Sequence, residues 1–310
     1  GIPFEFLCTG KKNNTVTNFY ASQKYLIEDY PISYSPSFSI WKELKERSIS
    51  DKTTALLVGD PTFQSNNNEY AESRGLKELD LYSRDIKMLP LRYSAKEIED
   101  IEGYFGDDVV LLGREATESN FKKNSSYSSI IHISTHSFLF KNNPVIIFGG
   151  DEDNDGYLET GEVAGLKLES DLVVLSSCKS GLGEENNAEG ILGMQKAFFD
   201  AGASSILLSL WDVSDKQTSI FMKFFYEFLS ENIDKSEALR KAKIKFINEV
   251  DPNPYYWAAF TLSGNSNSIF IEKKSFRGYY LFLSLSIVLI SYILFRKRNI
   301  FIKMQKSGKT

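Results

Sequence analysis

The sequence contains a cysteine and a histidine in positions from which they can perform nucleophilic chemistry. The apolar residues 172–175 lead through two serines to Cys178, and residues 129–135, which include three isoleucines, lead to His136. When a thiol lies next to an imidazole, the imidazole takes the proton and the resulting thiolate attacks. The chain has two histidines and two cysteines, and one of each stands at such a point.

Both stretches are predicted to be buried β-strands, because each is a short apolar run bounded by small and turn-forming residues. Sites in open α/β sheets lie at the carboxyl ends of the strands. If the two strands are parallel neighbours, Cys178 and His136 lie side by side. Two simpler interpretations stay open: a buried cysteine is usually a packing residue, and a histidine at a strand end is more often a hydrogen-bonded core residue.

The elements that must position these residues alternate between strands and helices. Ser94 and Glu97 have the spacing of a capping box, in which each side chain caps a backbone N–H group. The alternation predicts an α/β fold with a mostly parallel sheet and helices on both faces. Further strands are predicted over residues 55–61, 109–113, 145–148 and 204–210, and helices are predicted to begin at Ser37, Ser94, Thr117, Glu189, Ser214 and Ser236.

Composition and charge exclude some classes of function. The 310 residues carry a net charge of −5, and residues 1–270 show no basic stripe, so no nucleic-acid partner is expected. Cys8 and Cys178 are far apart in sequence and do not form a disulfide framework. The chain begins with Gly1 rather than Met, so we expect that it is processed or cut from something longer. Residues 1–17 are predicted to be an edge or junction segment.

The C-terminal region predicts a membrane anchor. Residues 279–295 contain no charged side chain. The length of this uncharged segment is near the lower limit for a helix that spans a bilayer. A basic tail follows at 296–310, and tyrosines stand near both ends of the uncharged segment. The excess of basic residues after the span places the tail in the cytoplasm and the catalytic domain on the other side of the membrane. The alternative is a buried helix of a soluble protein.

An acidic loop over residues 151–162 fits the pattern of a calcium-binding loop. Carboxylates stand at positions one, three, five and twelve, and a glycine stands at position six. The predicted calcium ligands are Asp151, Asp153, Asp155, Tyr157 and Glu162. The alternative is a plain turn, because acidic turns with glycine are common between strands. Apart from this possible Ca²⁺ ion, no cofactor is required by the predicted chemistry.

Several motifs together resemble the CHAT domain, a caspase-like peptidase domain often found behind tetratricopeptide repeats. The resemblance covers residues 18–264, and the predicted domain is 18–267. It is carried by Ile131-His132-Ile133-Ser134-Thr135-His136, Val173-Val174-Leu175-Ser176-Ser177-Cys178-Lys179-Ser180-Gly181, Ala201-Gly202-Ala203, Ser209-Leu210-Trp211-Asp212-Val213 and Trp257-Ala258-Ala259-Phe260. The resemblance implies a caspase–hemoglobinase fold, related to separases, gingipains and metacaspases.

The same resemblance implies a cysteine endopeptidase with a dyad of His136 and Cys178. It implies an oxyanion hole formed by backbone N–H groups, for which we expect Ser137 and Cys178. The family usually has glycine after the catalytic histidine, where this chain has Ser137. Relatives that cut after basic residues use an acidic pocket, a role predicted for Asp212. The alternative is that Asp212 only caps a turn.

The resemblance also predicts the partners. These are a protein or peptide substrate, the membrane, and an N-terminal tetratricopeptide-repeat region outside this chain. Two other functions stay open: a CHAT fold that docks partners at the membrane without catalysis, and acyl transfer to an acceptor that is not a peptide.

Overall fold

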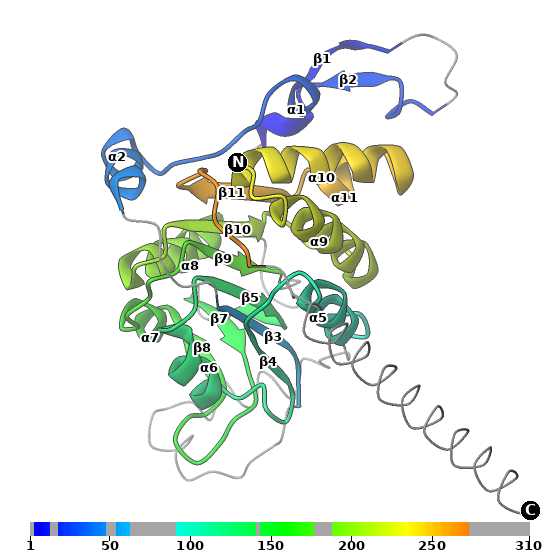
Figure 1. Ribbon diagram of the computed structural model, residues 1–310. Coiled ribbons are helices and arrows are strands. Elements are labelled where there is room, and N and C mark those ends of the chain that lie inside the picture. The colour runs from blue at the N-terminus through cyan, green and yellow to red at the C-terminus, as the bar shows by residue number, and fades with distance from the viewer. Residues whose placement is uncertain are drawn as a thin grey trace, which may run out of the picture. The chain divides into compact units, whose positions relative to one another are not determined.

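A six-stranded sheet forms the centre of the fold (Figure 1). The computed structural model describes residues 3–12, 18–47, 54–62, 91–140, 143–176 and 188–272. The strand order is β11-β10-β9-β5-β3-β4, in which β11 pairs antiparallel with β10 and every other pair is parallel. The strands are β3 (Ala55–Pro61), β4 (Asp108–Gly113), β5 (Ile130–Ser134), β9 (Leu172–Leu175), β10 (Ser205–Ser209) and β11 (Phe260–Gly264). The predicted α/β fold with a mostly parallel sheet is confirmed.

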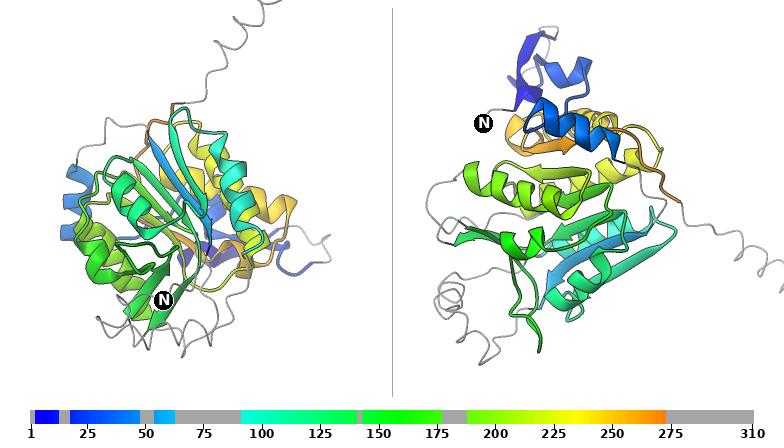
Figure 2. Two further views of the ribbon diagram at one scale, coloured as in Figure 1. Left: turned by 90° about the horizontal axis from the view of Figure 1, so that it is seen from below. Right: turned by 90° about the vertical axis from the view of Figure 1, so that its left-hand side faces the viewer.

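Helices cover both faces of this sheet, and the two views of Figure 2 show the sheet between them. Side chains alternate along each strand, so Val174 faces one helical layer and Val173 faces the other. Both layers are apolar, which explains why the strands read as continuous hydrophobic runs. One layer contains α5 (Ser94–Glu102), α9 (Asp215–Leu229) and α10 (Lys235–Glu249), and the other contains α6 (Glu118–Ser125), α7 (Thr160–Ala164) and α8 (Ala188–Ala201).

A separate three-stranded antiparallel sheet follows β5 directly, in the order β6-β7-β8. It is made of β6 (Ser137–Phe140), β7 (Asn143–Ile147) and β8 (Tyr157–Glu159). The remaining elements are η1 (Phe4–Phe6), β1 (Cys8–Lys11), β2 (Gln23–Tyr25), α1 (Leu26–Asp29), α2 (Phe38–Glu46) and α11 (Pro254–Trp257). In Figure 1 the β1–β2 hairpin and α1 lie next to α10, away from the central sheet.

Two buried charges join the N-terminal segment to α10. Glu5 of η1 and Lys243 of α10 have fully buried side chains, and the carboxylate and ammonium lie 3.0 Å apart. The Tyr34 hydroxyl donates a hydrogen bond to the same carboxylate and accepts one from the backbone N–H of Phe4. The N-terminal segment is therefore held by buried polar contacts as well as by apolar packing.

The local capping predictions give a mixed result. Ser37 and Thr117 are N-caps, as predicted: each hydroxyl accepts a hydrogen bond from a backbone N–H in the first helical turn. The capping box of Ser94 and Glu97 is wrong, because the N-cap of α5 is Tyr93. The Ser94 hydroxyl instead accepts from the backbone N–H of Asp60 and donates to the Ser134 carbonyl. These are tertiary contacts, which outweigh the local pattern.

The predicted localisation as a single-pass membrane protein is corrected by the structure. Among the described residues, no helix combines the length and the apolar character that crossing a bilayer requires. The segment 279–295, on which the prediction of an anchor depended, and the basic tail 296–310 lie outside the described residues.

Candidate active site

The two strands that lead to the predicted dyad are parallel neighbours. In the ladder between β5 and β9, Ile133 faces Leu175, and the backbone N–H of Ser176 continues it by donating to the Ile133 carbonyl at 2.9 Å. His136 follows Ile133 by three residues, as Cys178 follows Leu175. Adjacent strands lie about 4.8 Å apart. The pairing thus directs both chains out of the same edge of the sheet in register, although Cys178 itself lies outside the described residues.

His136 is buried at this edge, with 4% of its surface exposed. Its carbonyl accepts a hydrogen bond of 2.9 Å from the backbone N–H of Ile147, at the end of β7. The preceding residue, Thr135, donates its hydroxyl proton to the Ile147 carbonyl at 2.6 Å. The backbone around the predicted base is therefore fixed from two sides, by β5 and by the β6–β7 hairpin.

Both ring nitrogens of the second histidine, His132, have hydrogen-bonding partners in the core. His132 is fully buried in the middle of β5, with Nε2 2.8 Å from the Glu97 carboxylate and Nδ1 3.1 Å from the Tyr226 hydroxyl. Burial, followed by the charge of Glu97, raises the pKa of Tyr226 well above its usual value, so the hydroxyl keeps its proton. Both ring nitrogens of His132 are engaged, which leaves His136 as the one histidine for chemistry at the sheet edge.

The β6–β7 ladder defines the direction of the backbone N–H of Ser137, a residue predicted to contribute to the oxyanion hole. Ser137 faces Ile146 across the β6–β7 ladder, and the bond between Ile147 and His136 marks this as a non-hydrogen-bonded pair. In such a pair the N–H and C=O groups point away from the partner strand. The N–H of Ser137 is thus directed outward from the hairpin, next to His136.

Asp212 follows the neighbouring strand β10, whose Leu208 faces Leu175 of β9. The Asp212 carbonyl accepts a hydrogen bond of 2.7 Å from the Tyr255 hydroxyl. The indole of Trp211 in turn donates to the Tyr255 carbonyl at 2.8 Å. The structure thus brings Asp212 to the same edge of the sheet as His136, and its role in binding basic residues stays a prediction.

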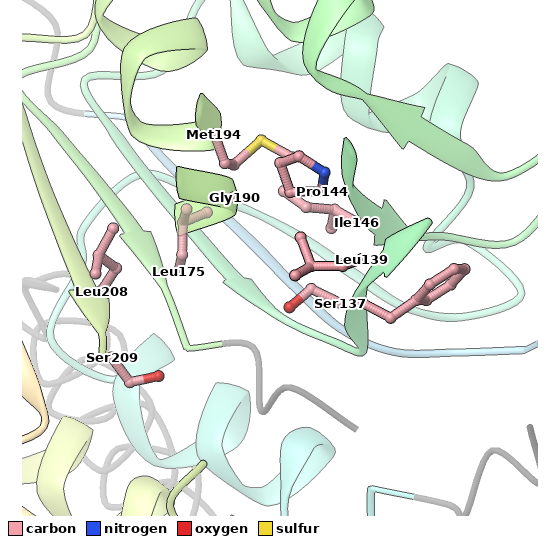
Figure 3. Close-up of a pocket in the computed structure, with 10 residues that line it drawn as sticks. Ser137, Leu139, Pro144, Ile146, Leu175, Gly190, Met194, Leu208 and Ser209 are labelled. Atoms are coloured by element: carbon pink, nitrogen blue, oxygen red, sulfur yellow. The ribbon is translucent and has the colours of Figure 1, made fainter. Parts of the chain in front are cut away.

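An apolar pocket, which no sequence pattern indicated, lies beside Ser137 (Figure 3). Its volume is about 60 Å³, several times the space that one water molecule needs. In Figure 3 the side chains of Met194, Pro144 and Leu139 point toward one another across it. The pocket is lined by Ser137, Phe138, Leu139, Pro144, Ile146, Leu175, Gly190, Met194, Leu208 and Ser209, none of which is charged.

The acidic loop begins after β7 and continues through β8 into the first turn of α7. Asp151 accepts hydrogen bonds from the Ser119 hydroxyl and from two backbone N–H groups of the loop. Burial opposes ionisation of Asp151, but these hydrogen bonds lower its pKa below the usual value. Asp155 accepts from the backbone N–H of Tyr157, and Glu162 accepts from the backbone N–H of Glu159 at the start of α7. The loop carboxylates are thus used as turn and helix caps.

A lysine supplies the positive charge for this loop. The ammonium of Lys122 lies 2.6 Å from the Glu118 carboxylate, 3.0 Å from Glu162 and 2.7 Å from the side-chain oxygen of Asn154. Among the described residues, no group of three or more histidine, cysteine or acidic side chains is arranged to hold a metal ion. The structure does not bring the five predicted calcium ligands together, and calcium binding stays a prediction from the sequence.

Replacing Lys122 by methionine is expected to lower the free energy of unfolding by about 1–3 kcal/mol, because it leaves a buried carboxylate without its cation. Burial raises the pKa of Glu118 to about 7, against the opposing hydrogen bond from Lys122. The folded protein therefore holds this proton more tightly than the unfolded chain, so the contribution of Glu118 to stability falls as pH rises from about 4.5 to 7.

Thermal unfolding measured at pH 6 and pH 8 checks this prediction. Without Lys122 the pKa of Glu118 rises further, so the variant loses more stability than the wild type between these pH values. The exposed neighbour Lys123 is the matched control, and Lys123→Met is expected to change little. Equal unfolding temperatures for the two variants at both pH values would contradict the role of Lys122.

Comparison with known proteins identifies the family. The CHAT domain family matches residues 1–265 of this sequence. The chain belongs to the CHAT domain family. Tetratricopeptide repeat protein 28 from Mus musculus is 33% identical over 109 residues, which cover 35% of this chain and 4% of that protein. The protein of the same name from Homo sapiens is 24% identical over 287 residues, which cover 79% of this chain and 11% of that protein.

This CHAT chain thus spans at most 11% of the length of these curated relatives. Solved structures with a similar arrangement include the separase–securin complex of Saccharomyces cerevisiae, with a TM-score of 0.47 and 16% identity over 78% of this chain and 14% of that chain. The Arg-specific cysteine proteinase gingipain R has a TM-score of 0.44 and 12% identity, over 76% of this chain and 53% of that chain.

Proposed function

We propose that this CHAT domain is a cysteine peptidase that uses His136 and Cys178 to hydrolyse peptide bonds. The observation that supports it most strongly is the register of β5 and β9, in which Ile133 pairs with Leu175, and each of these stands three residues before a member of the proposed dyad in the sequence. The contacts of both His132 ring nitrogens with Glu97 and Tyr226 give further support, because they leave His136 as the single candidate base.

In the proposed reaction His136 takes the proton of the Cys178 thiol, and the thiolate attacks the carbonyl carbon of the peptide bond. The oxygen that becomes negatively charged accepts hydrogen bonds from the N–H groups of Ser137 and Cys178. His136 then gives its proton to the departing amine, and a thioester remains on Cys178. Water, activated by His136, hydrolyses the thioester and restores the thiol. The finer expectation that cuts follow basic residues depends on Asp212.

The reactivity of Cys178 tests the proposal independently of any substrate. In a Cys8→Ser background, Cys178 is the only thiol of the chain. Its alkylation rate by iodoacetamide, measured from pH 5 to 9, is expected to stay high well below the ordinary cysteine pKa of about 8.5, because the imidazole stabilises the thiolate. Removal of the imidazole in His136→Ala should return the profile to an ordinary thiol.

A profile centred near pH 8.5 in both proteins would contradict the dyad. The CHAT fold would then serve as a docking module without catalysis, an alternative to which the replacement of the family's usual glycine by Ser137 gives some support. Alkylation reports on the thiolate and not on turnover, so the cleavage experiment in the Discussion completes the test.

A further inference from the structure

The edge of β6 next to His136 is open among the described residues. Within these residues β6 pairs only with β7, so its other edge faces no strand. Ser137 faces Ile146 and Leu139 faces Pro144. Both are non-hydrogen-bonded pairs, which agrees with the absence of an N–H group in Pro144. The N–H and C=O groups of Ser137 and Leu139 therefore point to the open edge.

The side chains of the same residues form one wall of the apolar pocket. Directly opposite residues of an antiparallel pair have their side chains on the same face. Ser137, Leu139, Pro144 and Ile146 thus make one continuous surface of the hairpin, and all four line the pocket. The other walls come from α8 and from the carboxyl ends of β9 and β10 (Figure 3).

The open edge of β6 and the apolar pocket together suit one kind of ligand. An extended peptide that adds to the open edge of β6 finds backbone hydrogen-bonding groups at every second residue. Its residues opposite Ser137 and Leu139 carry their side chains on the pocket face. Ser137 and Leu139 are only half-buried, so the edge is accessible to a ligand.

The lining determines which side chain enters. Seven of the ten lining residues are leucine, isoleucine, methionine, proline or phenylalanine, and the polar ones are two uncharged serines. A charged side chain would lose its hydration there with no partner of opposite charge. The volume of about 60 Å³ suits the four side-chain heavy atoms of leucine or methionine.

We infer that β6 and this pocket bind the substrate as an added antiparallel or parallel strand, with an aliphatic side chain of the substrate in the pocket. This inference rests on the proposed peptidase function, since it names the substrate class of the same site. It adds a recognition element on the histidine side of the site, separate from Asp212 on the β10 side.

The test uses the full chain with Cys178→Ala, which binds peptides without cutting them. The probes are fluorescein-labelled hexapeptide pools in which one position is fixed as Leu, Phe, Ala, Arg or Asp and the others are mixed. Fluorescence anisotropy should show one position at which Leu binds about 10-fold more tightly than Ala, from the burial of its apolar surface, and Arg and Asp more weakly still. N-methylation of the peptide amide that pairs with β6 should abolish binding.

A charge in the pocket should reverse the preference. In Leu139→Glu, pools with Arg at that position are expected to bind more tightly than pools with Leu. The control is Val250→Glu, an exposed position at the end of α10 on the other face of the sheet, where the preference for Leu should persist. If Leu139→Glu does not fold, Met194→Ala enlarges the pocket and should shift the preference from Leu toward Phe.

The inference is overturned if no position prefers Leu, or if the preference is the same in both pocket variants as in the parent. Incubation of the same pools with the chain that retains Cys178, followed by sequencing of the products, separates the two proposals. Binding with a preference for aliphatic side chains but without cleavage would contradict the peptidase proposal and support the proposed role of the pocket. Cleavage without a preference for aliphatic side chains would support the peptidase proposal and contradict the proposed role of the pocket.

Discussion

Replacing Cys178 by alanine, or His136 by glutamine, is expected to lower kcat/KM for peptide cleavage by about 10⁴-fold or more, because neither member of a nucleophile–base pair works without the other. The double variant should be no worse than either single variant, since residues that act as a unit are not additive. The measurement is cleavage of a mixed peptide library by the full chain, with the products sequenced by mass spectrometry.

The other histidine, His132 in the middle of β5, provides a matched control. His132→Gln removes the ring that contacts Glu97 and Tyr226 in the core, so we expect a lower unfolding temperature with cleavage per folded molecule largely retained. His136→Gln should show the opposite pattern, with folding retained and cleavage lost. If both variants cut at the wild-type rate while folded, or if Cys178→Ala still cuts, the dyad is not the catalytic unit.

The products also test the prediction for Asp212. If this residue binds basic side chains, Asp212→Asn should reduce cuts after Lys and Arg more than other cuts. An unchanged distribution of cut sites would contradict a role for Asp212 in binding basic side chains. The contact of Asp212 would then be the hydrogen bond that its carbonyl accepts from the Tyr255 hydroxyl.

The second large effect is expected on stability. Lys243→Met should lower the free energy of unfolding by about 3–5 kcal/mol, because it leaves the buried Glu5 carboxylate without its partner. Burial lowers the pKa of Lys243, and the adjacent Glu5 offsets part of this effect, so the ammonium depends on that carboxylate. Chemical denaturation followed by circular dichroism measures the change.

Two further variants make this prediction specific. Lys241→Met, on the same helix, removes an ion pair whose lysine side chain is 36% exposed, and should change the free energy of unfolding by less than about 1 kcal/mol. Glu5→Leu combined with Lys243→Met should recover much of the loss, because an apolar pair of similar volume replaces the ion pair. A loss in the double variant equal to the sum of the single losses would show that the two charges do not depend on each other.

The strands and their chemistry could be predicted from the sequence because the information is local. The run that became β9 is apolar along its whole length and the run that became β5 contains three isoleucines, as expected for strands buried on both faces, and each leads to a reactive residue. Sheet order is a property of distant pairings, so the position of β3 between β5 and β4 had no local signal.

Two local patterns have tertiary partners that spacing along the chain does not show. Glu97 has the right spacing to cap α5, but its carboxylate is taken by His132, which is 35 residues away. The acidic loop has the full spacing of a calcium site, and its Glu162 lies 3.0 Å from the ammonium of Lys122, from the preceding helix α6. In both cases a tertiary partner satisfies the charge, and spacing along the chain contains no information about it.

The apolar pocket was beyond sequence reasoning because its residues come from β6, β7, β9, β10 and α8. None of these segments is unusual alone, and each reads as ordinary core. The burial of Glu5 could not be predicted either, because its partner lies 238 residues away.

The edge of β6 that is open within the described part of the chain also affects how the protein behaves in concentrated solution. Unpaired N–H and C=O groups along a strand are a template for any other strand, including one from a second molecule, and exposed edges are a known source of aggregation. β6 is only four residues long, which limits the strength of such a contact. A bound peptide would occupy this edge, so ligands of the site should act as solubilising agents during purification and storage.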